Sequence, residues 1–315
     1  MRILVLGAGG TGGYFGGRLA QSGADVTFLV RPARALQLEK NGLQIRSPLG
    51  DADVAVAHVL AEDLVNIANE KPFDLVLLSC KAYDLDGSLD AIAPAMGSQT
   101  TLLPILNGLL HFDVLDARFG RERVLGGLCF ISATKGPGGE ILHLAKPASI
   151  TFGERDGTAD SARVQAFAAL CEQAGIDHLA ASNIHQELWI KYSFLSALAA
   201  GTCLMRASVG EIVANEGGTE FMTRLYAECV AVAAAVGQPI PGKKQEFALG
   251  TLTQQASTVK ASMLRDLEAG QRVEAAQIVG DMLHRARNSG IAAPLLGAAW
   301  CHLQAYESGL LERIN

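Results

Sequence analysis

The sequence has little charge, few aromatic residues and no excess of basic residues. Charged residues make up 18% and aromatic residues 6% of the 315 positions, whereas hydrophobic residues make up 49%. A disordered chain needs the opposite balance, low hydrophobicity with high net charge, and is therefore excluded. The formal net charge is −6, while nucleic-acid-binding domains carry a basic excess. We therefore expect a globular protein with no nucleic-acid partner.

Cysteine motifs are also missing. None of the six cysteines forms a C-x-x-C pair, and none stands at metal-ligand spacing from a histidine. Cysteines scattered in this way are typical of buried free thiols in a reducing compartment. We expect neither a disulfide framework nor a metal site.

Long apolar runs are missing as well. The longest, residues 194–205, is interrupted by Ser196, Gly201 and Thr202 and is shorter than the ~20 residues that span a bilayer. The first residues carry one charge, Arg2, and lack the basic, apolar and small-residue regions of a signal peptide. We therefore expect a cytoplasmic protein that does not associate with membranes.

Short apolar segments alternate with helical patterns in the first half of the chain. Strands that are apolar throughout are typical of a parallel sheet covered on both faces, so we predict a Rossmann-type, doubly wound α/β domain. Two Gly- and Thr-containing segments that follow are predicted to be antiparallel strands appended to this sheet. The predicted strands are 2–6, 24–30, 73–80, 101–106, 126–134, 139–153 and 176–181, and the predicted helices are 11–22, 88–96 and 161–174.

From about residue 183 onward, every clear pattern is helical. Apolar residues recur at three- and four-residue spacing over 186–208, 218–236, 243–269 and 273–288. A length of 315 residues also suggests two domains, at roughly 150 residues each. We predict a Rossmann-type domain over residues 1–182 and an all-α domain over residues 183–315. The Ala-rich helices could form the face of a homodimer.

A glycine-rich turn follows the first predicted strand and opens the first predicted helix. Its residues match G-x-G-x-x-G, the fingerprint of dinucleotide binding in this context. The first glycine permits a tight turn, the second lets a pyrophosphate approach the backbone, and the third lets helix and strand pack closely. The free N–H groups of the helix N-terminus would bind the phosphates. The motif consists of Gly7, Ala8, Gly9, Gly10, Thr11 and Gly12.

The end of the second predicted strand indicates which dinucleotide binds. Sites for NAD usually carry Asp or Glu here, which accepts a hydrogen bond from the ribose 2′-hydroxyl. This strand ends instead in Arg31, with Arg34 one turn further on. Because a guanidinium can bind a 2′-phosphate bidentately, we predict NADPH rather than NADH as the cofactor.

Four polar positions interrupt otherwise apolar segments. Lys81 and Asn107-Gly108 end two predicted parallel strands, at the edge where open α/β sheets bind ligands. Lys191 lies on an apolar helix, and Glu274 begins a later one. Such positions are more readily explained by function than by folding.

Together these residues resemble the ketopantoate reductase family (2-dehydropantoate 2-reductases). The resemblance covers almost the whole chain and implies a reductase that uses NADPH to convert a 2-oxo acid into a 2-hydroxy acid. The default reaction would convert 2-dehydropantoate into pantoate, in pantothenate biosynthesis. The matching motifs are G-x-G-x-x-G at 7–12, Lys81, Asn107-Gly108, E-L-W-x-K at 187–191, S-M-x-x-D at 262–266, and Glu274 followed by Gly280.

The resemblance also implies roles for residues of the helical half. Lys191 would be the general acid that protonates the carbonyl oxygen, since an ammonium group both polarises the carbonyl and donates a proton. Glu274 would bind the substrate hydroxyl and help to hold Lys191, and Ser262 would contact the substrate carboxylate. The cleft between the two domains would hold the substrate.

Three further residues would serve the cofactor. By the same resemblance, Asn107 would bridge the nicotinamide ribose and the substrate, Lys81 would lie beside the cofactor, and the backbone of Ala133 would contact NADPH.

The sequence departs from the family pattern in the substrate pocket. Leu195, Ala199 and Val209 stand where well-studied members carry asparagines. Losing such hydrogen bonds can change substrate selectivity by on the order of 100-fold. Arg206 is our candidate for a replacement anchor of the substrate carboxylate, provided that the helix bends near Gly201.

Three alternatives follow from these departures. The same chemistry could act on a different, less polar carbonyl substrate. The protein could be a non-catalytic regulator that binds NADPH, although such a protein needs neither Lys191 nor Glu274. It could also be a different 3-hydroxy acid dehydrogenase with the same two-domain plan, in which the catalytic lysine lies in a different local motif.

Overall fold

The computed structural model describes residues 1–314, with side chains to residue 310, and its packing divides the chain into two compact units. Unit 1 contains Met1–Leu106 and His111–Ile184, and unit 2 contains Asn107–Leu110 and the chain from His185 onward. The domains predicted from the sequence, 1–182 and 183–315, stay a prediction, because packing alone does not define a folding domain. The packing departs from that linear division in one respect: a short segment of the first half belongs to unit 2.

The first sheet of unit 1 is fully parallel. Its strand order is β5-β2-β1-β6-β7, and every neighbouring pair is parallel. The central strands are buried along most of their length, as their uninterrupted apolar sequences predicted. The strands are β1 (Arg2–Leu6), β2 (Asp25–Leu29), β5 (Ala57–Val59), β6 (Leu75–Leu78) and β7 (Thr101–Pro104).

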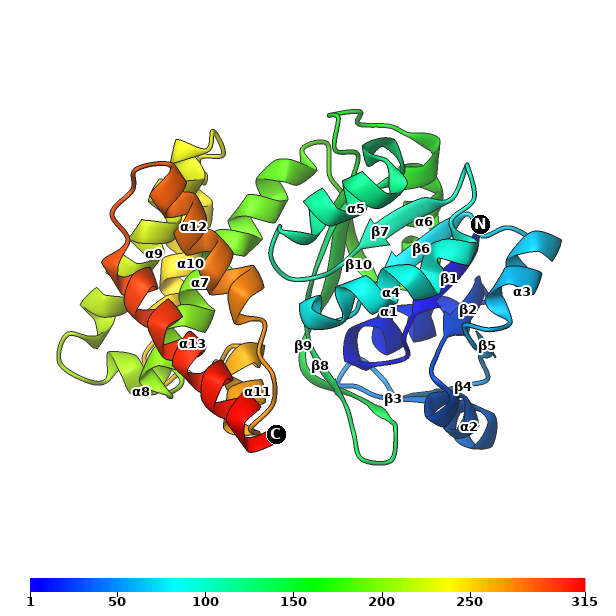
Figure 1. Cartoon of the computed structure of the whole chain (residues 1–315), viewed down its shortest axis with the longest axis horizontal. Helices are drawn as coiled ribbons and strands as arrows, with labels where there is room; N and C mark the ends of the chain where they lie inside the picture. The colour runs from blue at the N-terminus through cyan, green and yellow to red at the C-terminus, as the bar shows by residue number, and fades with distance from the viewer. Residues whose placement is uncertain (315) are drawn as a thin grey trace. The chain divides into compact units, whose positions relative to one another are not determined.

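A second sheet contains the strands that we expected to extend the first. β8 and β9 pair antiparallel as predicted and form a long hairpin, but β9 also pairs in parallel with β3 and β10 (Figure 1). The ladder of β8 and β9 is irregular between Ile131 and Ala133. The strands are β3 (Leu43–Arg46), β4 (Ala52–Val54), β8 (Gly126–Lys135), β9 (Ile141–Gly153) and β10 (Asp177–Ala180).

Helix α1 lies between the two sheets, and its glycines make this possible. A Cβ at Gly16 would lie 2.9 Å from Val5 of the first sheet, and a Cβ at Gly17 would lie 2.7 Å from Leu43 of the second. A larger residue at either position would therefore push a sheet away from the helix. The glycine-rich segment thus serves packing as well as the turn.

The other helices of unit 1 connect the strands. The predicted helices around 11–22, 88–96 and 161–174 are present, whereas α2, α3 and α5 were not predicted. Gly23 follows α1 with φ +90°, as expected for a helix C-cap. The helices are α1 (Gly10–Gln21), α2 (Pro32–Asn41), α3 (Leu64–Glu70), α4 (Leu85–Ile92), α5 (His111–Phe119) and α6 (Ala162–Gln173), with short 3₁₀ turns at Ala82–Asp84, Ala93–Ala95 and Arg121–Arg123.

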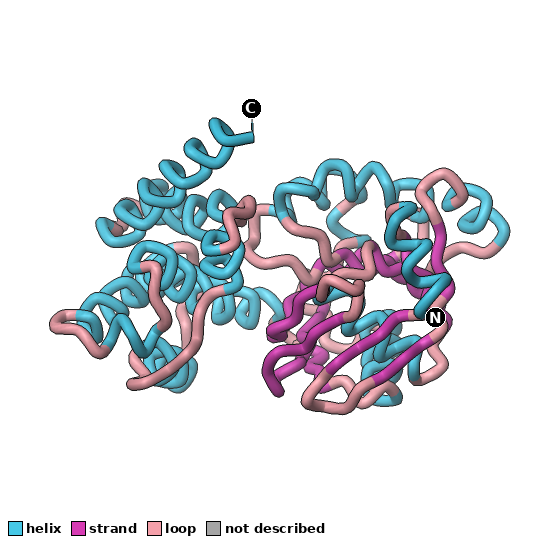
Figure 2. The backbone as a smooth tube through the Cα atoms, turned by 90° about the horizontal axis from the view of Figure 1, so that it is seen from below, coloured by secondary structure: helices cyan, strands magenta, loops and turns pink. Residues whose placement is uncertain are grey.

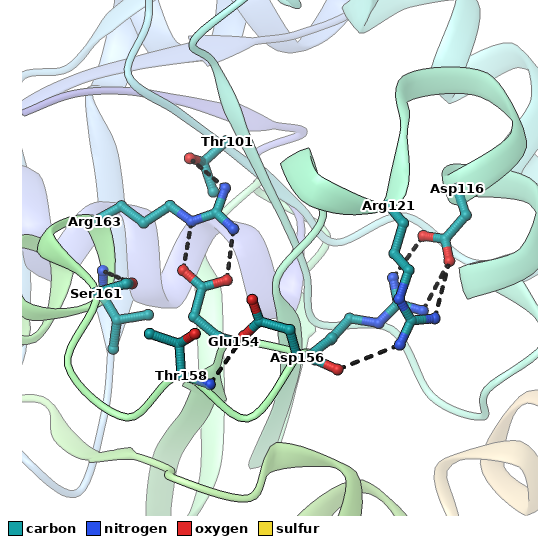
Figure 3. Close-up of polar contacts among 10 residues, drawn as sticks. Thr101, Asp116, Arg121, Glu154, Asp156, Thr158, Ser161 and Arg163 are labelled. Carbon is teal, nitrogen blue, oxygen red and sulfur yellow. Dashed lines mark hydrogen bonds and ion pairs between the residues drawn. The ribbon is translucent and has the colours of Figure 1, made fainter.

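Two bidentate ion pairs fix the end of β9 (Figure 3). The guanidinium of Arg163 donates to both oxygens of Glu154 at 2.7 and 2.5 Å, and Arg155 donates to both oxygens of Asp116 at 2.5 and 2.9 Å. Burial favours the neutral form of Glu154, but hydrogen bonds from Arg163 and Ser161 lower the pKa of its carboxyl below the usual value. The strand end is therefore tied to α5 and α6 by charged groups.

The described part of unit 2 consists of helices and loops (Figure 2). Its core is one cluster of buried apolar side chains drawn from all the longer helices. Gly237 and Gly290 follow α9 and α12 with positive φ, as is usual for glycine just beyond a helix C-terminus. The helices are α7 (Ile184–Met205), α8 (Val209–Val213), α9 (Gly218–Ala235), α10 (Gly242–Leu252), α11 (Ser262–Glu268), the π-helix Ala276–Gly280, α12 (Asp281–Asn288) and α13 (Pro294–Ile314).

The prediction of one helix over 243–269 was wrong. The helix is interrupted between α10 and α11, because residues there accept backbone hydrogen bonds from the start of α8. The N–H of Val209 donates to Val259 and the N–H of Gly210 donates to Ser257, both at 2.9 Å. Ala256 also has φ +55°, which a helix does not accommodate.

Helix α7 is long and apolar enough to cross a membrane by length and composition, with a mean hydropathy of 1.3. The sequence predicted no such segment, because its longest apolar run covers only residues 194–205. The helix that contains this run begins ten residues earlier, at Ile184. Within the fold, 72% of this apolar window is buried, as in the core helix of a globular protein. Its composition is therefore explained by the core of unit 2.

Candidate active site

The glycine-rich motif forms the turn between β1 and α1 in unit 1. Gly7 has φ +82° and donates its N–H to the carbonyl of Leu29 at 2.8 Å. A Cβ at Gly12 would lie 2.3 Å from Ser79 Oγ, so only glycine allows this approach of helix and strand. A Cβ at Gly7 or Gly9 would meet nothing within 4 Å, which leaves open space over the turn.

The turn has the donors that a pyrophosphate needs. The first N–H groups of a helix have no intrahelical acceptor. In α1 no side chain caps them either, because the N-cap residue is Gly9. These groups belong to Gly10, Thr11 and Gly12. The turn therefore fits the phosphates of a dinucleotide on geometric grounds.

Two arginines follow β2 with different surroundings. The Arg31 side chain is 88% exposed and lies 4.0 Å from Asp84. Arg34 donates from Nε to the carbonyl of Ala8 at 3.1 Å and from Nη1 to Gln37 at 3.1 Å. Its Nη2 is buried and has no hydrogen-bond partner among the described residues. This unsatisfied donor next to the glycine turn is suited to an anion such as a 2′-phosphate.

The structure brings Ala133 next to the glycine turn. A Cβ at Gly10 would lie 2.6 Å from the carbonyl oxygen of Ala133, so the two backbones are in close contact. Lys81 lies three residues after the end of β6, where it is half-buried and begins a 3₁₀ turn closed by the N–H of Asp84. The nucleotide-site residues predicted in unit 1 thus lie at the carboxyl ends of the parallel strands or on the adjacent hairpin.

In unit 2, the structure pairs Lys191 with Asn107. The Nζ of Lys191 donates a hydrogen bond to Asn107 Oδ1 at 3.0 Å. Lys191 is only 9% exposed and lies in the middle of α7, while Asn107 comes from the segment that follows β7. An ammonium group offers three N–H donors, and Asn107 accepts from one of them.

Glu274 and Ser262 occupy different environments. Glu274 is 6% exposed and immediately precedes the π-helix, and its carbonyl accepts the N–H of Ile278 at 3.2 Å. Ser262 is exposed at the first position of α11. Their predicted contacts with the substrate stay predictions.

A buried polar network, missed by the sequence analysis, joins α7 to the π-helix. The hydroxyl of Tyr192 lies within hydrogen-bond distance of two acceptors, Asp281 Oδ2 at 2.8 Å and the Ile278 carbonyl oxygen at 3.1 Å. The Nε of Arg285 donates to the same Asp281 oxygen at 2.8 Å. Burial, followed by the neighbouring Asp281, raises the pKa of Tyr192 well above its usual value. The one sequence signal was a tyrosine directly after Lys191 in an apolar helix.

The three positions that depart from the family pattern are apolar and largely closed to solvent. Ala199 and Val209 are 0% exposed, and Leu195 is partly buried against the core of unit 2. Two of the three positions are therefore sealed in the core.

The structure does not bring Arg206 to Lys191. The helix α7 is uninterrupted to Met205, and Arg206 follows it with φ +54° and an exposed side chain. Fifteen residues of helix separate the two positions by about 22 Å along the axis. This geometry does not support Arg206 as the carboxylate anchor next to Lys191.

Comparisons with known proteins agree with this arrangement. Two family models match the chain, Ketopantoate reductase PanE/ApbA over residues 3–157 and Ketopantoate reductase PanE/ApbA C terminal over residues 183–307. The uncharacterized oxidoreductase YkpB of Bacillus subtilis is 36% identical over 98% of this chain and 99% of its own length.

Two relatives with named activities are more distant. A 2-dehydropantoate 2-reductase of Halobacterium salinarum is 29% identical over 94% of this chain and 95% of its own length. The crystal structure of a 2-dehydropantoate 2-reductase from Geobacter metallireducens matches with a TM-score of 0.87 at 29% identity, over 97% of this chain and 99% of that chain.

Proposed function

Because the chain belongs to the ketopantoate reductase family and is an NADP-dependent oxidoreductase, we propose that it reduces 2-dehydropantoate to pantoate, with Lys191 as the general acid. The observation that carries this proposal is the hydrogen bond from Lys191 Nζ to Asn107 Oδ1 at 3.0 Å. It positions a largely buried ammonium group through a neutral acceptor, and an ammonium group can donate both a hydrogen bond and a proton to a carbonyl oxygen.

The cofactor of this family is NADPH, which supplies the hydride when bound. In unit 1, the N–H groups of Gly10, Thr11 and Gly12 would bind its pyrophosphate, and Arg31 with Arg34 would bind its 2′-phosphate. These residues are those that the sequence singled out, with Arg34 the more firmly positioned of the two arginines.

In the proposed reaction, residues of unit 2 donate the proton to the carbonyl oxygen of the substrate. The Lys191 ammonium would donate a hydrogen bond to the 2-oxo group of the substrate, which polarises the carbonyl, and then transfer its proton to that oxygen as the carbon accepts the hydride. The product is the 2-hydroxy acid, and Lys191 is left as a neutral amine. Asn107 Oδ1 would hold Nζ in place during this step.

Substrate contacts are assigned by family resemblance. Glu274 would accept a hydrogen bond from the substrate hydroxyl, and Ser262 would contact the carboxylate. The proposal includes a place in pantothenate biosynthesis and a cytoplasmic location, which the six free cysteines support. Homodimer formation stays a prediction.

A second candidate is the same reaction on a different, less polar 2-oxo acid. The observation that favours it is the complete burial of Ala199 and Val209, which removes two polar positions expected in the pocket. The regulatory alternative is not supported, because the chain belongs to the ketopantoate reductase family and its relatives include an oxidoreductase and several 2-dehydropantoate 2-reductases.

The test is the oxidation of NADPH in the presence of 2-dehydropantoate and a panel of other 2-oxo acids. We expect the highest kcat/KM for 2-dehydropantoate and a loss of about 100-fold or more in kcat for Lys191→Ala. A higher kcat/KM for an acid without a hydroxyl would favour the second candidate. Unchanged turnover by Lys191→Ala would overturn the assigned role of the lysine.

A further inference from the structure

The side-chain amide of Gln277 has incomplete hydrogen bonding among the described residues. Its Oε1 is buried and has no hydrogen-bond partner within the described part of the chain. A buried carbonyl oxygen without a partner costs about 1–3 kcal/mol, so such an atom in a native protein needs an explanation. A bound ligand is one such explanation.

The position of Gln277 favours this explanation. Gln277 lies on the π-helix, three residues after Glu274. A Cβ on Gly108 would lie 2.5 Å from the Gln277 carbonyl and 3.8 Å from its Cβ, so the side chain starts beside the segment that follows β7. The preceding residue, Asn107, accepts the hydrogen bond from Lys191. The orphaned amide therefore belongs to the same corner of unit 2 as the acid.

The backbone next to Gln277 is stabilised by hydrogen bonds from side chains of α7. The carbonyl of Ile278, the next residue, accepts from the hydroxyls of Tyr192 at 3.1 Å and Ser196 at 3.4 Å. Asp281 and Arg285 complete this buried network from α12. Single π-helical turns are often found at functional sites, and this one has a rigid support that a freely mobile surface residue lacks.

The neighbouring carboxylate limits what the amide can bind. The N–H of Ile278 donates to the carbonyl of Glu274 at 3.2 Å, so Glu274 and Gln277 lie on one turn of chain and their side chains can approach one group together. A hydroxyl both donates and accepts hydrogen bonds. It can donate to the Glu274 carboxylate while its oxygen accepts from the Gln277 amide, whose oxygen and nitrogen exchange places by rotation about the terminal bond.

We propose that Gln277 is a specificity-determining residue that, with Glu274, binds a hydroxyl group on the substituent of the 2-oxo acid. The proposal deepens the proposed function and rests on it. It also supplies an amide, whereas Leu195, Ala199 and Val209 are apolar at the three positions where the family pattern has asparagines.

The test compares two substrates on three proteins. The substrates are 2-dehydropantoate and its analogue in which hydrogen replaces the hydroxyl, and the proteins are the wild type, Gln277→Leu and Gln271→Leu. For Gln277→Leu we expect kcat/KM for 2-dehydropantoate to fall about tenfold, mainly through KM, because one hydrogen bond of uniform binding is lost. We expect kcat/KM for the analogue to stay within about twofold.

A comparison of Tm values distinguishes a role of Gln277 in substrate binding from a role in folding. Leucine removes an unsatisfied buried group, so the Tm of Gln277→Leu should be equal to or above that of the wild type. Gln271→Leu, on the exposed turn of the same segment, should change neither substrate preference nor Tm.

The failures of the two proposals are distinguishable. Equal loss of kcat/KM on both substrates, or a marked fall in Tm, would overturn the role of Gln277 while the reductase function stands. If the wild type reduces neither compound, the proposed function fails and the role of Gln277 fails with it.

Discussion

Lys191 Nζ and Asn107 Oδ1 are 3.0 Å apart, although 84 residues separate them in the sequence. The contact joins the central helix of the helical unit to the segment that follows β7. Asn107 Oδ1 accepts a hydrogen bond from the Lys191 ammonium group, and this bond restricts the orientation of the Lys191 side chain. Several expectations can be tested from this arrangement.

Replacing Asn107 by alanine should lower kcat without abolishing it. The acid would keep its charge but lose the acceptor that orients it, so we expect a fall of about tenfold in kcat. Steady-state kinetics with the best 2-oxo acid would measure this. A fall in KM alone, with kcat unchanged, would mean that Asn107 does not position Lys191.

Arg31 and Arg34 should determine cofactor preference. We expect alanine at either position to weaken NADPH binding about tenfold and to leave NADH binding within about twofold, because only NADPH carries the 2′-phosphate. Fluorescence titration of both cofactors measures this. Arg46→Ala, whose guanidinium pairs with Asp53 in the second sheet, is the control. An equal loss for both cofactors would indicate that the arginine supports the glycine turn instead.

The ion pair of Glu154 and Arg163 should make stability fall in acid. The carboxyl pKa is lowered in the folded state, so the stabilisation is present above the unfolded value of about 4.3 and is lost as pH falls through the folded pKa. Thermal unfolding between about pH 6 and pH 3 should therefore show a smaller loss of Tm for Glu154→Gln than for the wild type.

The matched control for this pair is Glu220, whose pairing with Arg224 at 3.5 Å is exposed on both sides. Exposed pairs contribute little to stability, so Glu220→Gln should follow the wild-type curve. Identical pH profiles for all three proteins would contradict the importance of the buried pair.

Tyr192→Phe should affect both stability and catalysis. The substitution removes the hydroxyl that reaches Asp281 and the Ile278 carbonyl, so we expect a loss of about 1–3 kcal/mol in the free energy of unfolding. We also expect a lower kcat, because the π-helix next to Glu274 loses support from α7. Denaturant unfolding and kinetics measure the two effects. Normal stability with normal kcat would show that the network is dispensable.

Arg206→Ala should leave KM within about twofold for any acidic substrate. The side chain is exposed beyond the end of α7, about 22 Å along the helix from Lys191. An increase in KM well above tenfold would restore the sequence-based hypothesis of a carboxylate anchor.

Local patterns were sufficient to predict the parallel strands β1, β2, β6 and β7 and the glycine turn, but not the short strand β5 or the helices α2, α3, α5, α8 and α13. The turn at Gly7 depends on one positive φ, and the C-caps at Gly237 and Gly290 depend on the same property, so neighbouring residues determine them. These features need no knowledge of distant contacts.

Long-range contacts account for what was missed. The break between α10 and α11 depends on hydrogen bonds that Val209 and Gly210 donate to Val259 and Ser257, 50 and 47 residues further along the chain. The bond from Tyr192 to Asp281 spans 89 residues, and no periodicity indicates it. Side-chain partners of this kind are determined by the tertiary fold, so a single sequence predicts them poorly.

The segment Asn107–Leu110 leaves the strand-rich unit and returns to it within four residues. A gene fragment encoding only the chain from residue 183 would therefore yield helices that carry the ammonium group but lack its amide acceptor. Dissection of this protein into halves separates Lys191 from Asn107, and any circularly permuted or split version must keep both segments to retain the pair.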